Sequence, residues 1–170
     1  MTQELIDLRN SITEGRYTDA LAIVDELEGI SKKAIIRQIK SFIKILLIHL
    51  IKNQIEQRLT NSWAASMRYA ILEIQDVNLK DTKKSYYVNE NEWQILIEDQ
   101  LTLAIGDASL EVLNGNLKRQ QISQMLNQEQ LLLNTTELLT MTYNYANREL
   151  PDIIDNYLAK LPGGEDWING

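Results

Sequence analysis

Apolar residues recur every three or four positions along most of this chain, the spacing that places them on one face of an α-helix. The first two such segments span residues 3–14 and 18–28, and Gly15 and Gly29 follow them as C-terminal caps. Residues 79–91 lack this periodicity, so they predict a loop. Two prolines and seven glycines interrupt the pattern at few positions. The sequence therefore predicts an all-α fold.

The longest periodic segment begins at Ser31, a good N-cap residue, and ends at about residue 57. On a helical wheel of about 100° per residue, most of its apolar side chains share one wide arc. These are Ile35, Ile36, Ile39, Phe42, Ile43, Leu46, Leu47 and Leu50. Ile45 and Ile48 fall outside the arc, so more than one side of this helix needs a contact. We predict a helical bundle of about six or seven helices around this central buried helix, residues 31–57.

The remaining helices are predicted from the same spacing and from their caps. They span residues 62–78, 92–114, 116–148, with a break near Asn127 or Asn134, and 151–160. The last residues, 164–170, are predicted to be loosely held unless Trp167 docks. A chain of 170 residues is most simply a single all-α domain, 1–170. Within it we predict a helical core over 1–115 and an additional C-terminal helical region over 116–170, and the sequence leaves open whether the two share a core.

The composition favours a soluble cytoplasmic protein. Hydrophobic residues make up 44% of the chain, and there is no cysteine for disulfides or thiol chemistry. The N-terminus has no signal-peptide pattern, and the longest apolar run, Phe42–Ile51, is too short and too polar to span a membrane. A net charge of −7 argues against broad binding to nucleic acids or anionic membranes.

Positive charge is nevertheless concentrated on the central helix. Residues 31–58 carry seven bases and one acid, whereas residues 1–30 carry two bases and seven acids. One helix face holds the candidate basic face, which consists of Lys33, Arg37, Lys40 and Lys44. It is suited to weak, salt-dependent contact with nucleic-acid phosphates. The charge balance favours instead pairing with Asp25, Glu26 and Glu28, if the preceding helix folds back antiparallel.

A candidate pocket lies where the central helix meets the next one, and it comprises His49, Arg58, Ser62 and Trp63. His49 is the only histidine, and in a pocket it would serve as a general base or a polar anchor. The structural interpretation is a core histidine that bonds a carboxylate or a backbone carbonyl. A single histidine at the edge of an apolar arc favours the structural interpretation.

Motifs for catalysis and cofactors are missing. There is no G-x-S-x-G, no G-x-G-x-x-G and no G-x-x-x-x-G-K-[ST]. Leu46 stands three residues before His49, where a di-iron helix needs Glu. The pairs Asp107 with Glu111 and Glu98 with Asp99 are more typical of a solvated helix face than of a Mg²⁺ or Ca²⁺ site. We therefore predict no metal and no cofactor, and the sequence argues against a conventional enzyme.

Four motifs occur in a characteristic order. They are Gly15-Arg16-Tyr17, VDELEGISKKAI from Val24 to Ile35, LLIHLIK from Leu46 to Lys52, and Arg58 followed by Ser62-Trp63. Together they resemble the bacterial domain of unknown function family numbered 29, over roughly residues 3–112. Asn53 replaces the family's usual Trp, and of its usual arginines after the Ser-Trp pair only Arg68 is present. The resemblance implies a helical fold and no activity, since that family is described only as uncharacterised.

Apolar residues exceed what one stripe per helix needs. They are Ile45, Ile48 and Ile55 on the central helix, with Leu131 to Leu133 and Leu138-Leu139 further on. Internal packing explains such a surplus, and so does a surface for another protein or a second copy. The leading hypothesis is a non-catalytic protein-binding module, with a homodimer as one form of it. The alternative is an enzyme or small-ligand binder that uses the candidate pocket, and nucleic-acid binding by the basic face is a weaker one.

Overall fold

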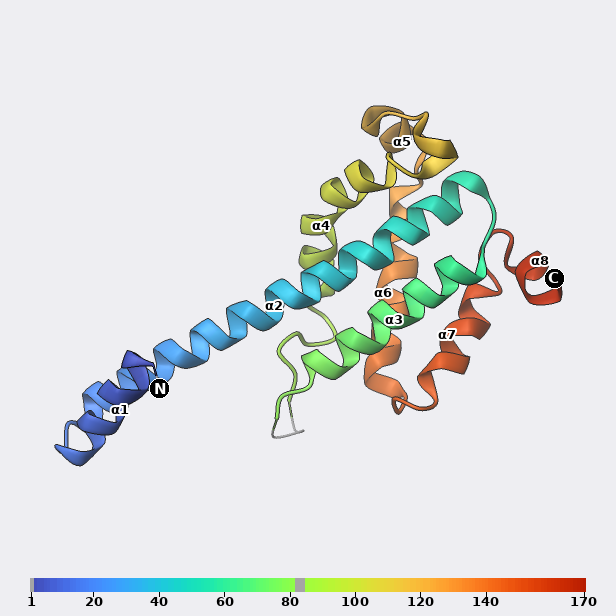
Figure 1. Cartoon of the computed structure of the whole chain (residues 1–170). Coiled ribbons are helices and arrows are strands. Elements are labelled where there is room, and N and C mark those ends of the chain that lie inside the picture. The colour runs from blue at the N-terminus through green and yellow to red at the C-terminus, as the bar shows by residue number, and fades with distance from the viewer. Residues whose placement is uncertain (1, 82–84) are drawn as a thin grey trace. The chain divides into compact units, whose positions relative to one another are not determined.

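The computed structural model describes residues 2–81 and 85–170, and in this part of the chain the fold is all-α, as predicted (Figure 1). Its helices are α1 (Gln3–Thr13), α2 (Tyr17–Glu56), α3 (Asn61–Asn78), α4 (Trp93–Ala108), the 3₁₀ helix η1 (Val112–Gly115), α5 (Arg119–Met125), α6 (Gln128–Asn144), α7 (Leu150–Leu158) and α8 (Gly164–Asn169). The described residues thus form eight α-helices, where about six or seven were predicted. Their only extended pairing is one isolated bridge, between Leu79 and Tyr86 in the predicted loop.

Contacts divide the chain into two compact units, Met1–Arg37 and Gln38–Gly170. The boundary falls within α2, so this helix contributes to both units. The residues of α1 and of the first part of α2 make their contacts chiefly among themselves.

Helix α2 is continuous where the sequence predicted a break. The predicted helices 18–28 and 31–57 are parts of a single helix, because neither Gly29 nor Ser31 ends it. Gly29 keeps a negative φ angle and does not adopt the left-handed conformation of a C-cap. A glycine inside a helix costs only about 1 kcal/mol relative to alanine, and long flanking helical segments offset that cost. Gly15, by contrast, has a φ of +73° and ends α1 as predicted.

The contrast between the two glycines is testable. A Cβ atom added at Gly29 meets nothing within 4 Å, so Gly29→Ala should stabilise the protein by roughly 0.5–1 kcal/mol. Gly15→Ala should destabilise it, because alanine does not tolerate the positive φ. Urea unfolding followed by circular dichroism at 222 nm measures both variants. A loss of stability in Gly29→Ala would mean that the helix is interrupted there after all.

The unit Gln38–Gly170 is built around the second part of α2. Phe42 and Tyr69 pack edge to face with their ring centres 5.9 Å apart, and Lys52 lies over the ring of Trp63. Because the residue numbers rise on one helix as they fall on the other, α3 runs antiparallel to α2. Helix α4 runs in the same direction as α2, since Lys40 pairs with Asp99 and Lys44 with Asp107. Helix α3 also packs on α6 and α7, and α4 packs on α5 and α6 (Figure 1).

The core of this unit is the predicted apolar arc of α2. Its fully or almost fully buried members are Ile39, Ile43, Leu46, Leu47 and Leu50, and Ile51, which was not part of the predicted arc, is buried beside them. Leu131, Leu138 and Leu139 of α6 are buried as well, so internal packing accounts for most of the predicted leucine surplus. Helices α6 and α7 therefore complete the same core as α3 and α4, a point that the sequence left open.

Several boundaries follow from local chemistry. The break in the segment 116–148 lies at Asn127, whose side chain accepts a hydrogen bond from the backbone N–H of Gln130 and caps α6. The predicted helix 92–114 ends earlier, at Ala108, and Leu113 and Asn114 adopt left-handed conformations within η1. The last residues are more ordered than predicted. They form α8, and Trp167 docks by donating a hydrogen bond from Nε1 to Asn61 Oδ1 at 2.7 Å.

Truncation of the α2 core should be costly. Leu46→Ala or Leu47→Ala removes a side chain with no exposed surface, so each should lower the free energy of unfolding by roughly 2–5 kcal/mol. Lys80→Ala, in the loop, should change it by less than about 0.5 kcal/mol. Chemical denaturation compares the three variants. A Leu46→Ala protein as stable as the parent would show that this arc is not the main core.

Candidate functional site

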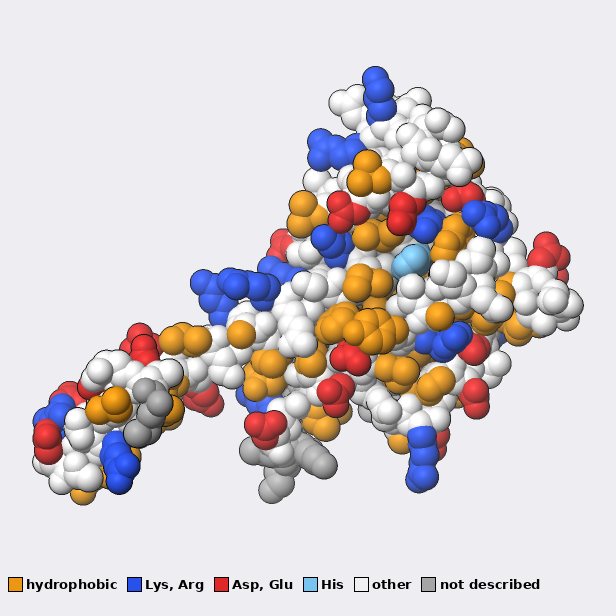
Figure 2. All heavy atoms as spheres, in the orientation of Figure 1, with side chains coloured by type: hydrophobic (Ala, Val, Ile, Leu, Met, Phe, Trp, Pro, Cys, Tyr) orange, Lys and Arg blue, Asp and Glu red, His pale blue; other side chains and the backbone are white. Residues whose placement is uncertain are grey.

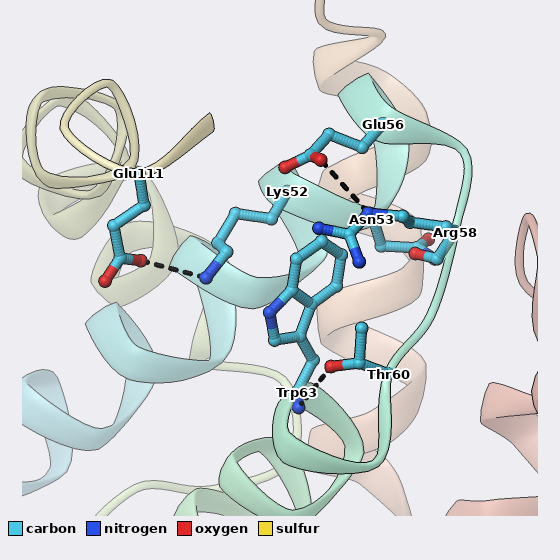
Figure 3. A network of polar contacts seen from close by, with 7 residues as sticks. All are labelled: Lys52, Asn53, Glu56, Arg58, Thr60, Trp63 and Glu111. Atoms are coloured by element: carbon cyan, nitrogen blue, oxygen red, sulfur yellow. Dashed lines mark hydrogen bonds and ion pairs between the residues drawn. The ribbon is translucent and has the colours of Figure 1, made fainter. Parts of the chain in front are cut away.

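The junction between α2 and α3 holds a tryptophan between two cations (Figure 3). The ring centre of Trp63 lies 4.7 Å from Lys52 Nζ and 4.5 Å from Arg58 Cζ, both within cation–π range. Thr60 positions this ring, because its Oγ1 accepts a hydrogen bond from the Trp63 backbone N–H at 3.1 Å and caps α3. The sequence thus places Trp63 in the first turn of α3, facing the end of α2.

Asn53 fixes the path of the chain through this junction. Its Nδ2 donates to the backbone oxygen of Arg58 at 3.0 Å and to that of Pro162 at 2.8 Å. Gly163 follows with a φ of +72°, and a Cβ atom there would lie 2.5 Å from Arg58 Cα. The backbone of the C-terminal segment therefore approaches Arg58 so closely that only glycine fits. Asn53 thus connects the junction to residues 162–163.

Both cations at the junction are compensated by carboxylates. Lys52 is only 8% exposed, and its Nζ lies 3.0 Å from Oε2 of Glu111. Arg58 Nε lies 3.1 Å from Oε1 of Glu56 on the last turn of α2. A buried lysine needs such a partner, because an unpaired charge in a low-dielectric site is costly. The two ion pairs leave little positive charge at the junction to attract an anionic ligand.

His49 is half-buried on α2, one turn before Lys52. Its pKa is lowered from 6.5 to about 4, mainly by burial and in part by the positive charge of Lys52, while Glu111 partly opposes the change. Its Nδ1 atom is buried and has no hydrogen-bond partner among the described residues. The imidazole is therefore neutral at pH 7, and its pKa is far below the value that suits a general base at that pH.

The low pKa of His49 sets a pH dependence. The unfolded chain binds a proton near pH 6.5 and the folded chain only near pH 4, so stability falls as the pH drops through this range. The Hε1 resonance of His49, the only histidine, should titrate in NMR spectra with a midpoint of about 4. His49→Leu should lose this part of the pH dependence of unfolding. A midpoint near 6.5 would contradict the burial of the ring.

The structure brings together some of the predicted pocket residues and not others. Arg58 and Trp63 are in contact, but Ser62 is exposed at the start of α3. His49 is linked to the group electrostatically, through Lys52 and Glu111. Sequence reasoning missed Lys52, although a lysine inside an apolar helical run is itself a signal of a buried ion pair. A cleft of about 650 Å³ lies elsewhere, between α3 and the end of α6, with Glu73, Gln75 and Tyr145 among its lining residues.

The candidate basic face is partly neutralised. Lys40 Nζ lies 3.4 Å from Asp99 Oδ2, and Lys44 Nζ lies 3.1 Å from Asp107 Oδ2, both on α4. The predicted pairing with Asp25, Glu26 and Glu28 is wrong, because α2 is continuous and those acids precede the lysines on the same helix. Lys33 and Arg37 are exposed. At least two of the four charges are thus already used within the fold, which weakens the case for phosphate binding.

The unit Met1–Arg37 exposes several large apolar side chains. Helix α1 folds back along the start of α2 through a short link at residues 14–16, and Ser11 and Ala20 are buried (Figure 1). The exposed large apolar side chains of this unit include Ile6 (36%) and Ile30 (56%). Five others lie on one side of the hairpin, and we call them the hairpin apolar face. They are Leu5 (42%), Ile12 (51%), Tyr17 (66%), Leu21 (64%) and Val24 (41%). Figure 2 shows apolar side chains at the surface of this unit, with acidic ones beside them.

Helical geometry places these five residues on one side of the hairpin. On each helix they lie roughly 40–120° around the axis from the buried small residue, in the same rotational sense. Because the two helices run in opposite directions, the same sense of rotation turns both stripes toward one side. Periodicity shows which residues share a face but not whether another element covers it.

Within the described residues, no group of three or more His, Asp or Glu side chains is arranged to hold a metal ion. In the same part of the chain, none of the helices has both the length and the apolar character needed to cross a membrane. Comparisons with models of known protein families, with curated proteins and with solved structures found no match.

Proposed function

We propose that this chain is a non-catalytic cytoplasmic protein that acts by binding another protein, and that the hairpin apolar face is its binding surface. The observation that supports this proposal is the exposure of five large apolar side chains on one side of a two-helix unit. Contiguous exposed apolar surface is unusual on a monomeric protein and typically marks an interaction site. The short motifs shared with family 29 are consistent with a common helical fold, and they add no activity to the proposal.

The energetics favour a covered hairpin. Fully burying one large apolar side chain contributes roughly 1.5–3 kcal/mol. The five side chains of the hairpin apolar face are on average about half exposed, so covering them would contribute roughly 4–8 kcal/mol before the costs of association. A unit of fewer than 40 residues with only two helices buries too little surface to be stable by itself. A partner that lies on this face supplies the missing layer.

A ligand site at the α2–α3 junction is the second candidate. It is supported by the buried Nδ1 atom of His49, which lacks a hydrogen-bond partner among the described residues. A small molecule with a donor group would satisfy this atom if it reached the space beside Lys52 and Trp63. The two ion pairs of the junction argue that such a ligand is neutral.

Site-specific photo-crosslinking tests the protein-binding proposal. With benzoylphenylalanine at position 21, in the cells that produce the protein, we expect a discrete crosslinked species. The matched control carries the same group at Leu110, which is 76% exposed in the other unit. Substituting both Leu5 and Ile12 by serine should remove the crosslink from position 21, because the partner loses apolar contact. Equal crosslinking from positions 21 and 110 would contradict the proposal.

A further inference from the structure

The cleft of about 650 Å³ lies between the second half of α3 and the end of α6, two helices that pack against each other (Figure 1). A volume of this size is typical of sites for small molecules. Apolar and aromatic side chains line much of the cleft. They include Leu72, Leu79, Tyr86, Tyr143 and Tyr145.

The amide of Gln75 holds one wall of the cleft in place. Its Nε2 donates hydrogen bonds to the backbone oxygens of Thr142 at 3.0 Å and Tyr145 at 2.8 Å. Its Oε1 accepts a third hydrogen bond, from Asn147 Nδ2 at 3.1 Å. These bonds join α3 to the segment that follows α6. The wall is therefore formed by the protein itself, without help from a ligand.

A second network fixes the aromatic part of the cleft. The buried Asn78 donates hydrogen bonds from Nδ2 to the backbone oxygen of Val88 at 3.0 Å and to the hydroxyl of Tyr143 at 3.1 Å. That hydroxyl donates in turn to the Val88 oxygen at 2.6 Å. The ring of Tyr86 packs edge to face on the ring of Tyr143, with their centres 4.7 Å apart. Both rings are thus held in fixed positions at the cleft.

Two carboxylates supply the charge of the cleft. Among the described residues that line it, the charged ones are Glu73 and Asp76. They lie three residues apart on α3, so their side chains leave the same face of the helix about one turn apart. Within the described part of the chain, neither has an ion-pair partner. Both are therefore available to a cationic ligand.

The described bases near the cleft do not neutralise these carboxylates. Lys80 follows the lining residues of α3, and Asp81 comes directly after it. Arg148 follows the lining residues after α6, and Glu149 comes directly after it. Each of these bases is thus matched by a neighbouring acid. Arg68, further back on α3, already forms an ion pair on α7. Among the described residues, the charge of the lining therefore remains negative.

We propose that this cleft binds a small organic cation, with an ammonium or guanidinium group on an apolar body. The charged group would lie against Glu73 and Asp76, and the apolar body would cover the tyrosine side chains. Aromatic faces also attract cations directly, which favours a cation over a neutral ligand of the same shape. The site lies within the unit Gln38–Gly170, so this inference goes beyond the proposed function and does not depend on the hairpin apolar face.

A metal ion fits the cleft less well than an organic cation. Mg²⁺ and Ca²⁺ take about six or more oxygen ligands. In the part of the chain that the structure describes, no group of three or more Asp, Glu or His side chains is arranged to hold a metal ion. An organic cation needs fewer carboxylates, because its apolar body gains contact with the aromatic lining.

Three probes of similar size test the inference with the full-length protein. They are phenethylamine, which is a cation at neutral pH, phenethyl alcohol, which is uncharged, and hydrocinnamate, which is an anion. Chemical-shift changes in ¹H–¹⁵N NMR spectra locate the binding of each and measure its affinity. We expect phenethylamine to shift the backbone signals of residues 72–79 and 142–147, and to bind at least about tenfold more tightly than the other two.

Neutral variants separate the effect of charge from the effect of shape. Glu73→Gln/Asp76→Asn should weaken phenethylamine binding at least about tenfold and leave phenethyl alcohol binding unchanged, because only the amine uses the charges. The matched control is Asp25→Asn/Glu28→Gln. It removes two charges at the same spacing from exposed positions of the unit Met1–Arg37, and should change the affinity for the amine by less than about twofold.

Several results would overturn the inference. One is equal affinity for the three probes, and another is equal weakening by the control variant, since both show that the two cleft carboxylates do not select the ligand. A third is the absence of shifts at the cleft with any probe at millimolar concentration.

Lys83 and Lys84 lie outside the described residues, so the variant Lys83→Ser/Lys84→Ser tests their effect. We expect it to bind phenethylamine at least as tightly as the parent protein. Binding by this variant and not by the parent would mean that lysines of the chain itself occupy the carboxylates, and the inference would then be wrong.

Discussion

Burial of one face of α2 is the constraint on which the larger unit depends. From Ile39 to Ile51 the side chains on this face have almost no exposed surface. Helices α3, α4, α6 and α7, which are far apart in the sequence, pack together in the same unit. On other sides of the helix, Lys40 and Lys44 form ion pairs with Asp99 and Asp107 of α4, and Lys52 forms one with Glu111 just after α4. These ion pairs orient α4, while burial of the apolar face of α2 holds the two helices together. Exposed pairs of this kind contribute little energy individually, and apolar burial supplies most of the stability.

The two units use the same helix differently. In Gln38–Gly170 the apolar side of α2 is covered by the protein itself, whereas in Met1–Arg37 the comparable stripe faces outward. The difference arises because the unit Met1–Arg37 contains only α1 and the start of α2, so no further helix of this unit is available to cover the stripe. Two helices cover each other along one line of contact, which here runs through Ser11 and Ala20. Their remaining apolar side chains stay exposed.

At the junction of α2 and α3, residues of the candidate ligand site also stabilise the turn between the two helices. Lys52 and Arg58 both make cation–π contacts with Trp63. Here each cation has its own carboxylate, and Asn53 and Gly163 connect the turn to the C-terminal segment. The arrangement stabilises the turn, and the buried Nδ1 atom of His49 has no hydrogen-bond partner among the described residues.

The sequence by itself determined the helical class, most helix positions and the buried arc of α2, because these depend on periodicity and local capping. Thr60 and Asn127 begin their helices for reasons visible in a few neighbouring residues. Only the tertiary structure decided that Gly29 and Ser31 lie inside a helix, that Lys40 and Lys44 pair with α4, and that Leu21 and Val24 are exposed. Such outcomes depend on which elements meet in space, and a local pattern of apolar residues does not contain that information.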